Sequence, residues 1–111
     1  MFFARKGKPR TVKISVKWMG RDVFLLYRLY REPASEDERD ICDGNVYSIS
    51  VEMIDMGGQR VCAEEAYDVS RSKDEARQIF RTLCRGLVTP DTALEIISDI
   101  ISIETEKSYK R

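Results

Sequence analysis

The spacing of apolar residues changes once along this chain, and the change constrains the fold more than any other feature. Apolar and polar residues alternate, as in half-buried strands, at residues 11–19, 22–31, 46–55 and 60–69. From residue 72 onward, apolar residues recur every three or four positions, as in amphipathic helices. The order predicts an α+β fold, in which a four-stranded antiparallel β-meander is followed by a C-terminal two-helix hairpin packed on one face (ββββαα).

The first two strands are expected to form a tight hairpin. The first of them has apolar residues at alternate positions: Val12, Ile14, Val16 and Trp18. A two-residue type II′ turn at residues 20–21 would set Trp18 opposite Val23. In that register the apolar side chains of both strands share one face, which we expect to be the inner face of the sheet.

Two registers are open for the third and fourth strands. Residues 32–45, which precede them, are polar and acidic and are interpreted as an exposed loop. A two-residue turn between the strands would set Val51 opposite Glu64, whereas a three-residue turn would set Met53 opposite Ala63. We prefer the second register because it matches apolar faces.

Both helices have recognisable start signals. Ser72 and Glu75 have the spacing of a capping box, and the first helix is expected to end near Gly86. Pro90 suits the first position of a second helix capped by Thr89. The apolar residues of this second helix cover about half of its circumference, more than one contact needs. Those at one edge are a candidate dimer contact: Ile96, Ile100 and Ile103.

The chain is interpreted as one domain at residues 11–104, between a disordered basic tail at 1–10 and a polar tail at 105–111. The formal net charge of zero hides an uneven distribution. Residues 1–31 carry nine Lys or Arg and one Asp, whereas residues 32–75 carry four Lys or Arg and thirteen Asp or Glu. The two parts can neutralise each other in the fold, or the basic part can bind an anion.

Short motifs in three segments are informative together. They are VYSISV at residues 46–51, LVTP at residues 87–90 and ALEIISDII at residues 93–101. Over residues 12–102 the chain resembles a small uncharacterised bacterial domain-of-unknown-function family known mostly from Firmicutes. Ser48 stands where that family usually has a glycine. The resemblance implies four strands followed by two helices, and it carries over no active site.

Side chains suited to catalysis or metal binding are sparse. The chain has no histidine, which makes a Ser–His or Cys–His nucleophile pair impossible. Cys42, Cys62 and Cys84 lie in different segments without the spacing of metal ligands. Glu64 and Glu65 would point to opposite faces of a strand. We expect no enzymatic activity, no cofactor and no metal, and a cytoplasmic protein with reduced thiols and no membrane span.

The reverse face of the first hairpin is the best candidate for a binding surface. It mixes apolar or aromatic side chains with unneutralised basic ones: Lys13, Lys17, Phe24, Leu26, Arg28 and Tyr30. If both helices cover the opposite face, this patch is exposed, and exposed apolar surface rimmed by charge commonly marks an interface. We expect a non-catalytic protein-interaction or regulatory module that self-associates as a homodimer. The alternative is a single-stranded nucleic-acid-binding module that stacks bases on the aromatic residues, although no RNA-recognition signature is present.

The two helices carry rows of opposite charge. The basic ridge on the first helix consists of Lys73, Arg77, Arg81 and Arg85. Like charges at this spacing repel by about 0.2–0.5 kcal/mol per pair. The acidic ridge on the second helix consists of Asp91, Glu95 and Asp99. The ridges can meet along the hairpin or lie in solvent, or the basic ridge can bind a partner.

Overall fold

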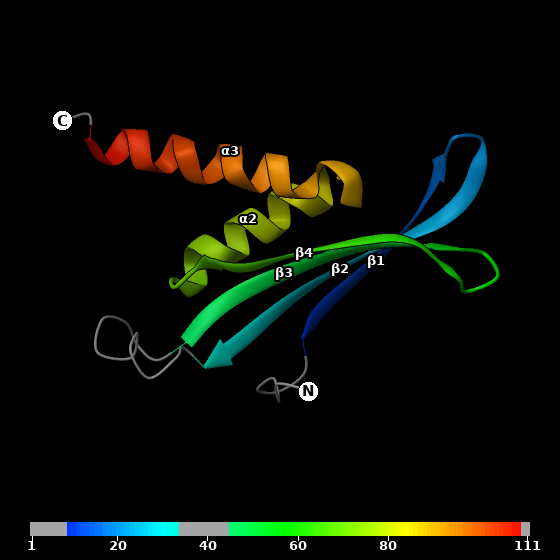
Figure 1. Cartoon of the computed structure of the whole chain (residues 1–111), viewed down its shortest axis with the longest axis horizontal. Coiled ribbons are helices and arrows are strands. Elements are labelled where there is room, and N and C mark those ends of the chain that lie inside the picture. Colours follow the sequence, from blue (N-terminus) through cyan, green and yellow to red (C-terminus); the bar gives the residue numbers. More distant parts are fainter. Residues whose placement is uncertain (1–8, 34–44, 110–111) are drawn as a thin grey trace.

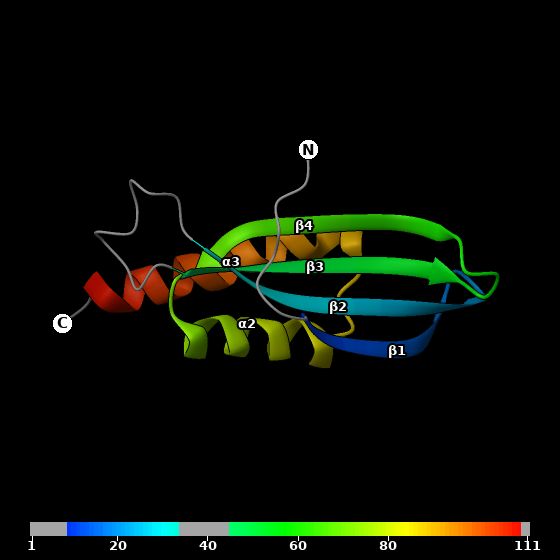
Figure 2. The same cartoon turned by 90° about the horizontal axis from the view of Figure 1, so that it is seen from below.

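The computed structural model describes residues 9–33 and 45–109, with side chains for 9–32 and 45–102. One antiparallel sheet in the order β1-β2-β3-β4 is followed by two helices on the same side of it, which confirms the α+β prediction (Figure 1, Figure 2). The elements are β1 (Arg10–Trp18), β2 (Arg21–Pro33), β3 (Asn45–Asp55), β4 (Arg60–Ser70), α2 (Lys73–Arg85) and α3 (Pro90–Tyr109). The expectations for Cys42, the Ile103 side chain, and most of the basic tail and acidic loop lie outside the described residues.

The hydrophobic core lies between the helices and the inner face of the sheet. Leu25 and Ile49, in the central strands, are 0% and 1% exposed. The helices contribute buried side chains to the same core: Ala76, Ile79, Phe80, Leu83, Ala93 and Ile97. The expected inner face of the first hairpin is confirmed, because the apolar residues of β1 pack against this core. Tyr27 is fully buried, and its hydroxyl donates a hydrogen bond to the Val88 carbonyl at 2.9 Å.

The register of the first hairpin differs from the expected one by two residues. Trp18 lies opposite Arg21, and the expected pairing of Trp18 with Val23 is wrong. The turn consists of Met19 and Gly20, whose φ angles of 51° and 78° fit a type I′ turn. Since the shift is an even number of residues, every side chain keeps its predicted face.

The register preferred for the third and fourth strands is wrong. Val51 lies opposite Glu64, which is the other register considered above, and Met53 does not pair with Ala63. A bulge at Val61 places an extra residue on β4 and shifts the pairing beyond the turn. As a result, Ala63 lies on the face of the sheet away from the helices.

The helix starts agree with the sequence. Ser72 Oγ accepts a hydrogen bond from the Glu75 N–H at 3.3 Å, and α3 begins at Pro90. After α2, the Val88 N–H donates to the Leu83 carbonyl at 3.1 Å, as in a Schellman motif. This turn brings the Val88 carbonyl to the buried tyrosine of β2. α3 then continues into the segment interpreted as a polar tail.

Candidate interaction surface on the open face of the sheet

We call the side of the sheet away from both helices the open face. Within the described residues no helix lies over it (Figure 2). Alternation along β1 and β2 places all six candidate residues of the first hairpin on this face: Lys13, Lys17, Phe24, Leu26, Arg28 and Tyr30. The sheet therefore brings together the surface that the sequence predicted.

The middle of the open face is covered, whereas its margins are accessible. Leu26 is 8% exposed and Glu52 is 7% exposed. The expectation of an exposed patch is therefore wrong for Leu26. The other candidates near β1 and at the ends of β2 are exposed or half-buried: Lys13, Lys17, Phe24 and Tyr30. A partner would reach the margins of this face first.

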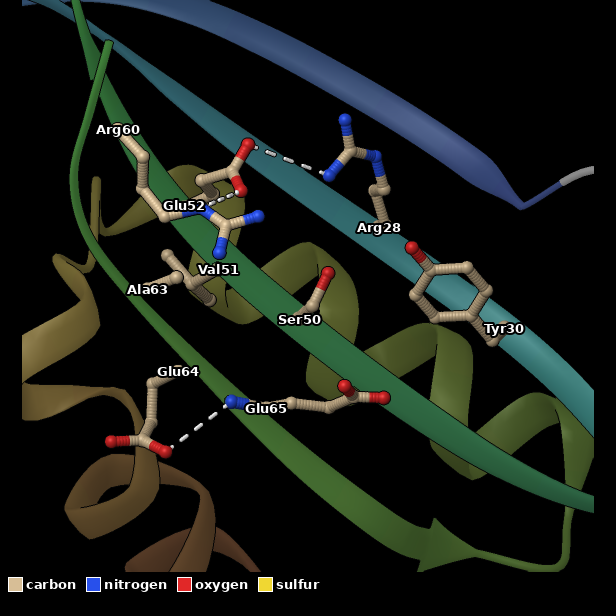
Figure 3. A pocket seen from close by; sticks show the side chains of 9 residues that line it. All are labelled: Arg28, Tyr30, Ser50, Val51, Glu52, Arg60, Ala63, Glu64 and Glu65. Carbon is tan, nitrogen blue, oxygen red and sulfur yellow. Dashed lines mark hydrogen bonds and ion pairs between the residues drawn. The ribbon is translucent and has the colours of Figure 1, made fainter. Parts of the chain in front are cut away.

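Glu52 joins two arginines from neighbouring strands in the middle of the open face. Its carboxylate Oε2 is 2.6 Å from Arg60 Nε, and its Oε1 is 3.6 Å from Arg28 Nη1 (Figure 3). The side chain of Glu52 is 10% exposed, so a cation beside it offsets a charge that would be costly to bury alone. The expectation of unneutralised positive charge is therefore wrong for Arg28.

One cation–π contact and one hollow lie beside this ion-pair network. Lys13 Nζ lies 4.2 Å from the centroid of the Phe24 ring, within the range of a cation–π contact. A hollow of about 250 Å³ is bordered by Tyr30 and Glu65. The hydroxyl oxygen of Ser50 lies in this hollow, is buried and makes no hydrogen bond to any residue that the structure describes (Figure 3). The hollow can therefore offer one further hydrogen bond.

Sequence reasoning missed Glu52 and Arg60 as part of this surface. Glu52 lies beside Leu26 on one side and Ala63 on the other in the ladder. Its place on the open face could have been found from the alternation of β3. The approach of Arg60 could not, because it depends on the bulge in β4.

The helix candidates are arranged differently from the sheet candidates. Arg77 of the basic ridge is half-buried, and its other three members and the whole acidic ridge are exposed. In the part of the chain that the structure describes, no ion pair joins the two ridges, so of the arrangements considered above the structure favours ridges that lie in solvent. Ile96 and Ile100 are half-buried and pack against the core, so part of the proposed dimer contact is already covered within one chain.

The remaining reactive groups are separated. Glu64 and Glu65 lie on opposite faces of β4, as expected. Burial raises the pKa of the free thiols of Cys62 and Cys84, which disfavours the reactive thiolate. Among the described side chains, no cluster of three Cys, Asp or Glu could hold a metal ion. Likewise, no helix in the described ranges has the length and apolar character needed to cross a membrane.

Comparison with known proteins gives one match. The model of a family of unknown function, DUF6514, matches residues 11–103. No curated protein and no solved structure matches the chain. The matched residues include all four strands, α2 and most of α3. Because the match covers most of its length, this chain belongs to the DUF6514 family, a family of unknown function.

Proposed function

We propose that this domain is a non-catalytic protein-interaction module that self-associates as a symmetric dimer through the open face of its sheet. The observation that supports this best is the division of charge across that face. Lys13 is exposed on β1 at one margin, and Glu65 is exposed on β4 at the other. Between them Glu52 pairs with two arginines and offsets one of their two positive charges. A surface with opposite charges at its two margins is complementary to a second copy of itself.

One arrangement of two copies uses this complementarity. A two-fold axis parallel to the strands places β1 of one copy over β4 of the other, so that Lys13 lies over Ala63 of the second copy, and its long side chain extends toward Glu65, two residues along the same strand. Phe24 and Ile54 are neighbours in the β2–β3 ladder, and the same operation lays Phe24 of one copy on Ile54 of the other. Both side chains are half-buried in the single chain and would become more buried in the dimer. An apolar contact within a charged rim is typical of a specific interface.

The non-catalytic part of the proposal rests on chemistry. The chain lacks histidine, and its adjacent carboxylates Glu64 and Glu65 are kept apart by the sheet. The free, separated thiols of Cys62 and Cys84 support a reducing compartment, the cytoplasm. The resemblance described above supports a bacterial origin for the protein.

Light scattering joined to size-exclusion chromatography tests the dimer. At concentrations of about 10–100 μM, the chain of 12.9 kDa is expected to elute with twice that mass. Phe24→Glu should give a folded monomer, because a charge is tolerated on an open surface but not inside an apolar interface. Met19→Glu is the matched control: Met19 is 83% exposed at a hairpin tip, away from the contact, so this variant should remain dimeric.

A charge exchange makes the test independent of any folding defect in Phe24→Glu. Lys13→Glu should weaken the dimer, and the double variant Lys13→Glu with Glu65→Lys should restore it, because the two reversed charges again meet across the interface. A monomeric wild-type chain would refute the proposal. Dissociation by Ile100→Glu, with Phe24→Glu still dimeric, would move the contact to α3.

Nucleic-acid binding is less well supported, because Glu52 offsets one of the two charges of Arg28 and Arg60, and Glu65 adds negative charge nearby. A labelled single-stranded RNA is expected to show no binding to the protein at low salt in a fluorescence anisotropy titration. If it binds instead, with an affinity that falls steeply with salt and weakens on Lys13→Ala or Lys17→Ala, the open face is a nucleic-acid site.

A further inference from the structure

β1 is the regular edge of the sheet. Its nine residues pair with β2 without interruption, whereas the pairing of β4 with β3 is irregular at two places. Proteins commonly protect an exposed edge strand with bulges, prolines or charges, because its unpaired backbone can bind another strand. β4 has such bulges. β1 has a continuous ladder without proline or glycine, and its protection is limited to charged side chains, among them Lys13 and Lys17.

The tight turn after β1 fixes which of its backbone groups are free. Trp18 and Arg21 flank a two-residue turn and therefore form a hydrogen-bonded pair, and such pairs alternate with non-bonded ones along an antiparallel ladder. The even-numbered residues of β1 thus bond to β2, and the N–H and C=O groups of the odd-numbered residues point outward. Within the described ranges these outward groups have no partner. They belong to four exposed residues: Thr11, Lys13, Ser15 and Lys17.

The inner face of β1 is only partly covered. The helices pack mainly on β2, β3 and β4, and α2 lies toward the end of the sheet opposite the hairpin turns (Figure 2). In consequence the apolar residues of β1 are half-buried: Val12, Ile14, Val16 and Trp18. A further strand beside β1 would place its own apolar side chains against this row and remove more of it from water.

We propose that the β1 edge binds an extended segment of a partner protein in which apolar and acidic residues alternate. The outward backbone groups of β1 would continue the ladder, and the side chains of the added strand would select the partner. Its apolar residues would extend the inner face, and its acidic residues would lie beside Lys13 and Lys17. A second copy of β1 fits less well, since antiparallel pairing centred on Ser15 sets Lys13 opposite Lys17. The backbone groups of this edge are separate from the open-face contact, whereas the Lys13 side chain belongs to both.

A proline substitution tests the backbone contact directly. Because the Ser15 N–H points outward, Ser15→Pro removes a donor from the free edge and leaves the β1–β2 hydrogen bonds in place. The probe is a fluorescein-labelled, capped peptide of about nine residues, the length of β1, in which valine and glutamate alternate. In an anisotropy titration, Ser15→Pro should bind it about tenfold or more weakly than wild type, and the control Ser15→Ala within about twofold.

A second pair of measurements tests the side-chain contact without changing the backbone. A matched peptide that alternates valine and lysine should bind wild type about tenfold more weakly than the acidic one. Lys17→Glu, at an exposed lysine that the dimer contact does not use, should weaken binding of the acidic peptide and strengthen binding of the lysine peptide. This variant also gives the answer if Ser15→Pro does not fold. The proposal is overturned if the acidic peptide shows no binding at about 1 mM, or if a folded Ser15→Pro binds as well as wild type. Ser15→Pro should remain a dimer. Loss of peptide binding at the β1 edge can therefore be told apart from loss of the dimer contact on the open face.

Discussion

Replacing Ile49 with alanine is expected to lower the free energy of unfolding by about 2–5 kcal/mol. Ile49 is 1% exposed in a central strand and packs in the core beneath the helices. The substitution removes buried apolar groups and leaves a cavity that the surrounding side chains fill only partly. Leu25→Ala, at a fully buried position of β2, should have an effect of the same size. Urea denaturation followed by circular dichroism measures both changes.

An exposed residue provides the control for these core variants. Met56 is 62% exposed in the turn between β3 and β4, so Met56→Ala should change the free energy of unfolding by about 0.5 kcal/mol or less. A loss below about 0.5 kcal/mol for Ile49→Ala would show that the inner face of β3 had been assigned to the wrong side of the sheet.

Replacing Tyr27 with phenylalanine is expected to cost about 1–3 kcal/mol at neutral pH, because the Val88 carbonyl loses its donor in a buried site. The hydrogen bond joins residues far apart in the sequence and holds the segment between α2 and α3 on the sheet. Chemical denaturation of the two proteins at pH 7 gives this difference. The control is Tyr47→Phe, at a half-buried residue outside this contact. It should lower the free energy of unfolding by less than Tyr27→Phe does.

The effect of Tyr27→Phe should also depend on pH. Burial raises the pKa of the Tyr27 phenol above its ordinary value of 10.0, so the folded state keeps a proton that the unfolded state loses. The stability that Tyr27 contributes is therefore fully present below pH 10 and falls as the pH rises above it. The difference between wild type and Tyr27→Phe should shrink by about 1 kcal/mol between pH about 7 and about 10.5. An unchanged difference would mean that the phenol is not protected from ionisation.

The faces of β1, β2 and β3 could be predicted from the sequence, but the face of β4 and the registers of both hairpins could not. Alternation alone assigns side chains to faces, and it did so correctly for the first hairpin. The register depends on the turn, and Met19 adopts a positive φ at a position that glycine or asparagine usually takes, so the residue type does not indicate this turn. The bulge at Val61 likewise shifts the register between β3 and β4 away from the one that was expected.

The candidate surface was predicted only in the half that belongs to the first hairpin. Lys13, Phe24 and Tyr30 were placed on the open face by alternation and lie there. The charge balance of this face depends on Glu52 and Arg60, which meet across β3 and β4. Their contact requires the register that the sequence left open. The prediction from the sequence therefore overestimated the positive charge of the open face.

The central claim, a dimer through the open face, is tested most directly by a zero-length carbodiimide cross-link mapped by mass spectrometry. Within one copy, Lys13 and Glu65 are separated by three strand spacings and two residues along the strand, about 16 Å, which is too far for direct amide formation between their side chains without unfolding. The proposed dimer brings Lys13 of one copy to Glu65 of the other. We predict that this cross-link forms in the species of doubled mass and disappears in Phe24→Glu. Cross-linked dimers joined only through α3, or no cross-linked dimer at all, would contradict the proposal.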